Sequence, residues 1–139
     1  MSAPLIKKIL DSIKNINTRV KNLENHVELF NGCAQAGDTI TLNDSFKKYR
    51  FLHVITGTTT KDFGGALVGS TVNSNEEIHC MKTWVNDVLS MQVHSVFLNV
   101  NDYTHLTVTN AAYKQIATNG VTVSSNVNGC YVKKIYGCY

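Results

Sequence analysis

Apolar side chains in the first thirty residues keep a strict alternating spacing of three and four. In heptad notation, eight of them fill the core: Ile6, Ile13, Val20 and Val27 at position a, and Ile9, Ile16, Leu23 and Phe30 at position d. A period of 3.5 residues draws helices into a left-handed supercoil whose a/d seam is buried against partner chains. The pattern therefore predicts a helical stalk within an oligomer, with the rest of the chain displayed on it.

The residues in and beside this seam indicate how many chains associate. Isoleucine at both a and d in the first two heptads favours three or four strands over two, and the a positions lack the Asn that often specifies a dimer. Arg19 at g is placed to pair with Glu24 at e of a parallel neighbour. We therefore expect a parallel homotrimer. The alternative is one amphipathic helix that packs on its own domain.

The chain divides into two expected parts at a helix-ending signal. Asn31 and Gly32 are residue types that adopt the left-handed conformation common just after a helix. We therefore expect a coiled-coil trimerisation stalk over residues 1–31 and a separate head domain over residues 32–139. A head of this size is large enough to bury a hydrophobic core of its own.

Composition argues against several classes of partner. The net charge of +3 is modest and forms no basic stripe, so we expect no binding of nucleic acid. No run of about 18 apolar residues is present, which argues against membrane insertion. Charged residues interrupt the N-terminal apolar positions, so we expect no signal peptide and synthesis in a cytoplasm. The four cysteines lack metal-site spacing and are expected to be free thiols.

Beyond Gly32 the hydrophobic period shortens towards two, and turn residues such as Asn-Gly separate runs rich in Val and Thr. This pattern of alternating residues and turns predicts a mainly β head, an antiparallel β-sandwich of jelly-roll-like form. Residues 110–117 are expected to form a helical turn or a wide loop. Eight strands are predicted, over residues 39–42, 49–56, 66–72, 77–85, 88–100, 103–109, 121–124 and 130–137.

Two segments of the head resemble a known group of proteins. Residues 32–46 read GCAQAGDTITLNDSF and run into KKYRFLHV, and residues 131–137 read YVKKIYG. Both are similar to the opening and closing strands of head domains in bacteriophage tail-fibre and baseplate receptor-binding proteins. The resemblance implies a trimeric virion protein that recognises a bacterial surface, commonly a glycan. Its motifs are structural, so it carries over no receptor-binding residue.

The sequence argues against catalysis and against a bound metal or cofactor. Glycan hydrolysis needs two carboxylates at a defined separation, but Glu76 and Glu77 are adjacent and the head's aspartates stand mostly at turn positions. No two histidines have the close spacing of a local chelate. Threefold symmetry offers one alternative, a metal bound on the axis by one histidine from each chain.

Receptor contacts are expected where aromatic rings stand beside planar polar side chains, since both kinds of group bind sugars. One candidate cluster is Trp84 with Asn86 and Asp87. A second cluster comprises Asn101, Asp102 and Tyr103, in the next hairpin along the chain. A third candidate is Lys61 with Asp62, in a long loop over residues 57–65. A lone Trp in a sandwich is otherwise a core residue.

Together these features predict a homotrimeric virion protein of the tail-fibre or baseplate type that binds a host-surface glycan or protein without catalysis. Its stalk is expected to dock onto other virion proteins. The chief alternative is a structural virion protein, such as a decoration, plug or connector, whose head contacts other virion proteins. A cellular trimeric adhesin is a third possibility, disfavoured by the missing signal peptide.

Overall fold

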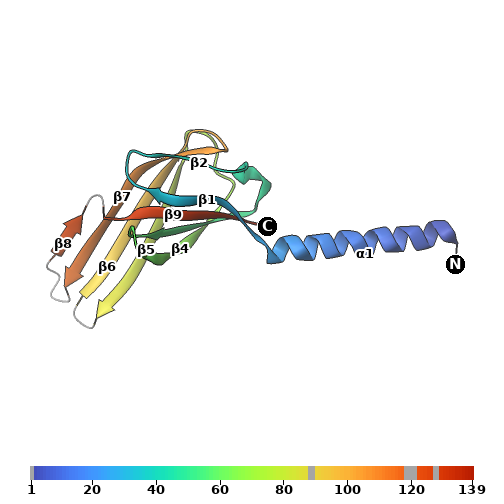
Figure 1. Ribbon diagram of the computed structural model, residues 1–139, viewed down its shortest axis with the longest axis horizontal. Coiled ribbons are helices and arrows are strands. Elements are labelled where there is room, and N and C mark those ends of the chain that lie inside the picture. The colour runs from blue at the N-terminus through green and yellow to red at the C-terminus, as the bar shows by residue number, and fades with distance from the viewer. Residues whose placement is uncertain (1, 88–89, 118–121, 127–128) are drawn as a thin grey trace.

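The chain begins with a helix, α1 (Ala3–Glu24), that extends away from a β-rich head (Figure 1). Figure 1 shows a computed structural model, which describes residues 2–87, 90–117, 122–126 and 129–139. The Ser2 hydroxyl caps the helix by accepting a hydrogen bond from the Leu5 amide at 3.4 Å, and Pro4 stands in the first turn, where a missing amide is tolerated. The helix thus starts where its sequence signals place it.

The apolar stripe of α1 faces solvent. Its core positions keep between 43 and 58% of their surface exposed: Ile6, Ile9, Ile13, Ile16 and Val20. Arg19 is exposed as well, while the side chains of Leu23 and Glu24 lie outside the described part of the structure. A helix that packed on its own head would bury this stripe, so that alternative does not match the structure.

The prediction that the helical stalk continues to residue 31 is wrong. The helix ends at Glu24, Asn25 is extended, and strand β1 (His26–Ala34) follows at once. Val27 and Phe30 are therefore strand residues and not heptad positions. Leu29, which a continued heptad would place on the solvated side, is completely buried in the head. Pairing with the last strand and burial of Leu29 outweigh the local helical pattern.

Two antiparallel sheets form the head. The first sheet has the order β1-β9-β3-β4, with β3 (Phe51–Gly57), β4 (Asp62–Gly69) and β9 (Tyr131–Cys138). The second sheet has the order β2-β7-β6-β5, with β2 (Thr39–Thr41), β5 (Glu77–Asp87), β6 (Ser90–Val100) and β7 (His105–Ala117). A further strand, β8 (Thr122–Asn126), pairs with the end of β7. The short 3-10 helix η1 (Phe46–Lys48) links β2 to β3.

The hydrophobic core lies between the two sheets. In β3, Leu52 and Val54 point inward and are completely buried, while Phe51, the first residue of the strand, is exposed. This is the period-two alternation of a half-buried strand. Phe46 of η1 closes the core and is also completely buried. Both sheets contribute to the same cluster, chiefly through Leu29, Leu52, Val54, Val132, Ile135, Ile40, Ile78, Val96, Leu98, Leu106 and Val108.

The mainly antiparallel β architecture predicted from the sequence is confirmed. The pairs β1–β9 and β2–β7 join segments far apart in the chain, whereas β3–β4 and β5–β6–β7 are consecutive hairpins. The loop or helical turn predicted over residues 110–117 is wrong, because β7 continues to Ala117. The long loop predicted over residues 57–65 is also wrong, since β4 already begins at Asp62.

Candidate binding face

A row of polar side chains crosses the outer face of the second sheet. Thr39 of β2 pairs with Thr107 of β7, Thr107 pairs with Asn99 of β6, and Asn99 pairs with Glu77 of β5. These residues alternate with buried neighbours such as Ile40 and Leu106, so they point away from the core. Four strands thus bring hydroxyl, amide and carboxylate groups into one line. We call this row, together with Asn101, the polar row.

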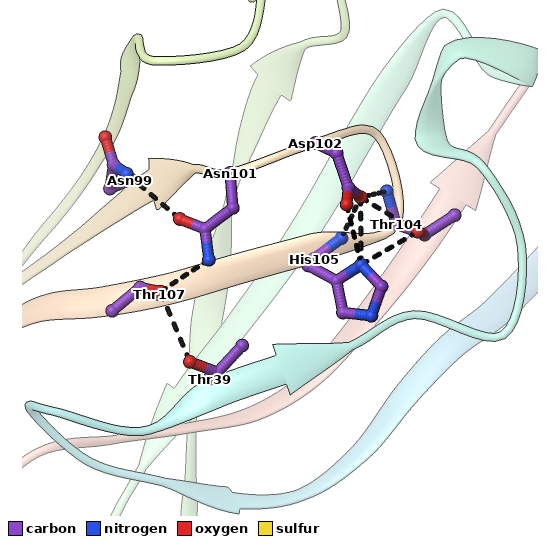
Figure 2. A network of polar contacts seen from close by, with 7 residues as sticks. All are labelled: Thr39, Asn99, Asn101, Asp102, Thr104, His105 and Thr107. Atoms are coloured by element: carbon purple, nitrogen blue, oxygen red, sulfur yellow. Dashed lines mark hydrogen bonds and ion pairs between the residues drawn. The ribbon is translucent and has the colours of Figure 1, made fainter.

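Hydrogen bonds fix the orientation of the polar row (Figure 2). Asn101 donates from its Nδ2 to the Thr107 hydroxyl at 2.8 Å and accepts at its Oδ1 from Asn99 Nδ2 at 3.0 Å. The hydroxyls of Thr107 and Thr39 lie 3.3 Å apart. Each group keeps further donor or acceptor capacity, because an amide and a hydroxyl both donate and accept. The row is therefore pre-organised for a polar ligand.

The β6–β7 turn beside the polar row is organised by Asp102 (Figure 2). Its Oδ1 accepts hydrogen bonds from the Thr104 amide at 2.7 Å, the Thr104 hydroxyl at 2.9 Å and the His105 amide at 2.8 Å. The His105 ring nitrogen Nδ1 lies 2.9 Å from Oδ2 of the same carboxylate. Hydrogen bonds from the Thr104 amide and hydroxyl and from His105 lower the pKa of Asp102 to about 2. Asp102 is thus ionised and occupied within its own turn.

A bulge in β7 brings a second set of side chains next to the polar row. The register shifts between Phe97 and Leu98, so Thr109 is the extra residue of β7. The Thr109 hydroxyl lies 3.3 Å from the Phe97 carbonyl and 3.4 Å from Glu77 Oε1. The His79 ring stacks on Phe97 with centroids 4.1 Å apart and an interplanar angle of 23°, and its Nε2 lies 3.0 Å from Glu77 Oε2. Aromatic surface therefore adjoins the polar row.

Tyr103 at the tip of the turn is held by residues of η1. Its ring meets the buried Phe46 edge-on at a centroid distance of 5.7 Å, and Lys47 Nζ lies 5.0 Å from the Tyr103 centroid. The Phe46 amide donates to the Tyr103 carbonyl at 3.0 Å. Tyr103 still exposes 40% of its surface. The predicted cluster of Asn101, Asp102 and Tyr103 is thus brought together in one rigid turn.

The other predicted contact residues lie elsewhere in the head. Asn86 and Asp87 lie at the C-terminal end of β5, beside the start of β6, whereas the Asn101 turn follows the other end of β6. The side chains of Trp84, Asn86 and Asp87 lie outside the described residues. The three predicted clusters therefore do not form one site.

Lys61 and Asp62 belong to the tight β3–β4 turn of the first sheet. Thr58 closes this turn, because its amide donates to the Lys61 carbonyl at 2.8 Å and its hydroxyl accepts from the Lys61 amide at 3.1 Å. Lys61 and Asp62 are both exposed. Lys134 Nζ lies 3.2 Å from Asp62 Oδ2, and this contact raises the pKa of Lys134. Asp62 is therefore engaged by its own chain rather than held free for a ligand.

Sequence reasoning missed Thr39, Thr107, Glu77, His79 and Phe97 as site residues. Alternation with apolar neighbours shows from sequence alone that such residues face outward. Their proximity depends on the pairing of β2 with β7, whose paired residues Thr39 and Thr107 are 68 positions apart. The bulge at Thr109 is likewise a property of the paired strands. No local signal gives either feature.

The chemistry assembled on this face suits binding. Hydroxyls, amides and an exposed ring can hydrogen-bond and stack with a sugar. Across the described ranges, no group of three or more His, Cys, Asp and Glu side chains is arranged to hold a metal ion.

Comparison of the chain with protein-family models, with curated proteins and with solved structures finds no match. Within the described residues, no helix is long and apolar enough to span a membrane.

Proposed function

We propose that the chain is a homotrimeric attachment protein whose α1 helices form a parallel coiled coil and whose head binds a host-surface glycan without catalysis. The observation that carries the proposal is the exposed heptad stripe of a helix that extends away from the head (Figure 1). Soluble proteins rarely leave such a continuous apolar surface uncovered. Association of several copies would cover it.

The identity of the stripe residues supports a trimer. Ile6 and Ile13 at position a, with Ile9 and Ile16 at position d, are the combination that disfavours a parallel dimer. The exposed Leu10, 53% accessible, widens the apolar surface beside the seam. A wider seam fits an assembly with more than two strands.

The polar row supports a sugar as the ligand. Asn99, Asn101 and Thr107 present amide and hydroxyl groups whose orientation is already fixed, and His79 stacked on Phe97 adds a ring surface beside them. A single shallow site of this kind binds weakly. Three copies on one stalk raise the apparent affinity by a factor of about 100 to 10,000 when they engage together.

The resemblance of residues 32–54 and 131–137 to bacteriophage receptor-binding heads supports a place in a virion. In this role the N-terminal end of the stalk docks onto other virion proteins, and the head faces the bacterial surface. A structural protein of the same particle is the competing role, and glycan binding distinguishes the two.

A glycan array probed with the full-length protein tests the proposal. We expect wild type to bind a restricted set of glycans and the Asn101→Ala/Thr107→Ala variant to lose at least about tenfold in apparent affinity, because both oriented groups are removed. Thr83→Ala is the matched control, an exposed threonine roughly 20 Å from Glu77 along β5. It should bind as wild type does.

Two outcomes contradict the glycan proposal. A trimer that binds no glycan would indicate the structural role, and equal losses for Thr83→Ala and the double variant would remove the polar row as the binding site. Release of reducing sugar from a bound polysaccharide would contradict binding without catalysis.

A further inference from the structure

The outer face of the first sheet carries apolar and aromatic side chains where solvent is expected. One row across it runs from Glu28 of β1 through Tyr136 of β9 and His53 of β3 to Leu67 of β4. The adjoining row contains His26 and Phe51, which both pair with Cys138. We call the set of His26, Phe51, His53, Leu67 and Tyr136 the junction face, because it begins where α1 meets the head.

The apolar members of the junction face are strongly exposed. Leu67 exposes 68% of its surface and Phe51 exposes 42%. The solvated face of an antiparallel sheet normally carries polar residues. Strand β4, whose sequence is DFGGALVG, is one of the two edge strands of the sheet and lacks the Lys or Pro that commonly blocks pairing at an edge. The outer face of the first sheet therefore has the composition of a surface that is buried against another protein surface.

Three rings stiffen the part of the junction face nearest the helix. The centroids of His26, His53 and Tyr136 lie between 6.2 and 6.4 Å from one another. His26 is the first residue of β1, and only Asn25 separates it from α1. Figure 1 shows β1, the end of β9 and the C-terminus at this junction. The junction face is thus fixed in position relative to the end of the helix.

The dimensions of a coiled coil bring the heads together. Packed helices lie about 8–10 Å apart, whereas a four-stranded sheet is roughly 14 Å across and a sandwich adds a second layer about 10 Å away. A connection of one residue, Asn25, leaves no length to separate heads that are wider than the spacing of their helices. Three heads on such a stalk must therefore touch, and the face next to the helix end is the one in reach.

We infer that the junction face packs against the head of the next copy in the trimer, so that the head contributes an interface of its own. This inference rests on the trimer of the proposed function. In a threefold ring each contact joins two different surfaces of neighbouring copies, so the β1 edge of one head meets the β4 side of the next. Glu28 lies on the β1 edge, and the exposed Arg50 lies beside Phe51, with its guanidinium carbon 5.7 Å from the Phe51 ring centroid. Arg50 also lies beside the end of β4, where its carbonyl accepts from the Ser70 amide at 3.1 Å, so the β1 edge and the β4 side carry charges of opposite sign.

Hydroxyl-radical footprinting of the full-length protein tests this interface. Leu67 and Phe51 should be oxidised several-fold more slowly in the wild-type trimer than in a full-length Ile9→Asp/Ile16→Asp variant whose helices cannot associate. Met91, exposed near the start of β6 in the second sheet, is the internal reference and should react equally in both. A trimer in which Leu67 and Phe51 react as fast as in the monomeric variant would overturn the junction-face interface and leave the coiled coil intact. A wild-type monomer would overturn both.

A pair of matched variants gives a second measurement. Leu67→Lys places a charge within the junction face and should raise the concentration at which the trimer dissociates by about tenfold or more. Met91→Lys introduces the same charge at an exposed position of β6 in the second sheet and should leave that concentration within about twofold. Equal effects of the two variants would overturn the inference. If Leu67→Lys does not fold, footprinting of the wild-type protein decides alone.

Discussion

Asp102 shows how one side chain holds a surface turn in a single conformation. Its carboxylate accepts from the amides of Thr104 and His105 and from the Thr104 hydroxyl. Neighbouring Asn101 is thereby held where it reaches both Asn99 and Thr107. The sequence identified Asp102 as a turn residue and a candidate contact, and the structure gives it the positioning role within the turn.

The lowered pKa of Asp102 has a consequence for stability at acid pH. Because the folded pKa, about 2, is below the ordinary value of 3.8, the carboxylate stabilises the fold above pH 4, and this contribution is lost as the pH falls towards 2. The difference in unfolding free energy between wild type and Asp102→Asn should therefore shrink between pH 4 and pH 2. Denaturant unfolding over this range measures it, with Asp11→Asn on the exposed helix as the control. A difference that stays constant across the range contradicts the role given to Asp102.

The four cysteines should divide into one reactive and three protected thiols. All are free, and Cys33 is exposed whereas Cys80, Cys130 and Cys138 are buried. Burial raises the pKa of Cys80 to about 12 and also raises the pKa values of Cys130 and Cys138, so their thiolate fractions fall. A thiol reagent at neutral pH should label one site in the native protein and four in denaturant, as counted by mass spectrometry. Rapid labelling of Cys80 in the native protein would contradict the fold.

At the scale of single elements, the start of the head shows where a sequence pattern fails. Val27 and Phe30 continue the heptad spacing of α1, and nothing local separates them from the helix. Leu29 decides the outcome, because a strand buries it completely while a continued helix would expose it. Strand pairing with β9, about a hundred residues away in the chain, supplies the partner. Tertiary contacts of this range lie beyond a local pattern.

Substitution of Leu29 distinguishes the strand from a longer helix. Leu29→Ala should destabilise the head by about 2–5 kcal/mol, because it leaves a cavity in the core. Position c of a coiled coil faces solvent, where the same change would cost less than about 0.5 kcal/mol. Asn31→Ala, at an exposed position of β1, is the control and should have little effect. Thermal and denaturant unfolding report the difference, and a harmless Leu29→Ala would favour the longer helix.

Most other strands could be predicted from the period-two pattern and their turn residues. The strands at 39–41, 77–87 and 131–138 lie close to their expected positions. The prediction of a loop or helical turn over residues 110–117 failed because Ala111 and Ala112, which suit a helix, instead continue β7 in its pairing with β6. The candidate site divides in the same way. Its turn residues could be found in the sequence, but the row across four strands could not.

At the scale of the whole molecule, the exposed stripe of α1 and the short connection at Asn25 are the features that favour an assembly. In the trimer that we propose, partner helices cover the exposed stripe of α1, and the single connecting residue Asn25 brings the heads into contact. Multivalent display of the polar row and contact at the junction face both follow from that assembly. A trimer is therefore the central proposal, and the heptad pattern of α1 predicts it.

Light scattering of the full-length protein in solution, beside an Ile13→Asp variant, tests this claim most directly. Aspartate at an a position places a charge in the seam and should abolish association. We predict a wild-type mass three times the chain mass of 15.4 kDa and a variant mass of 15.4 kDa. A wild-type mass of 15.4 kDa at every concentration would contradict the coiled coil, and with it the attachment role and the junction-face interface.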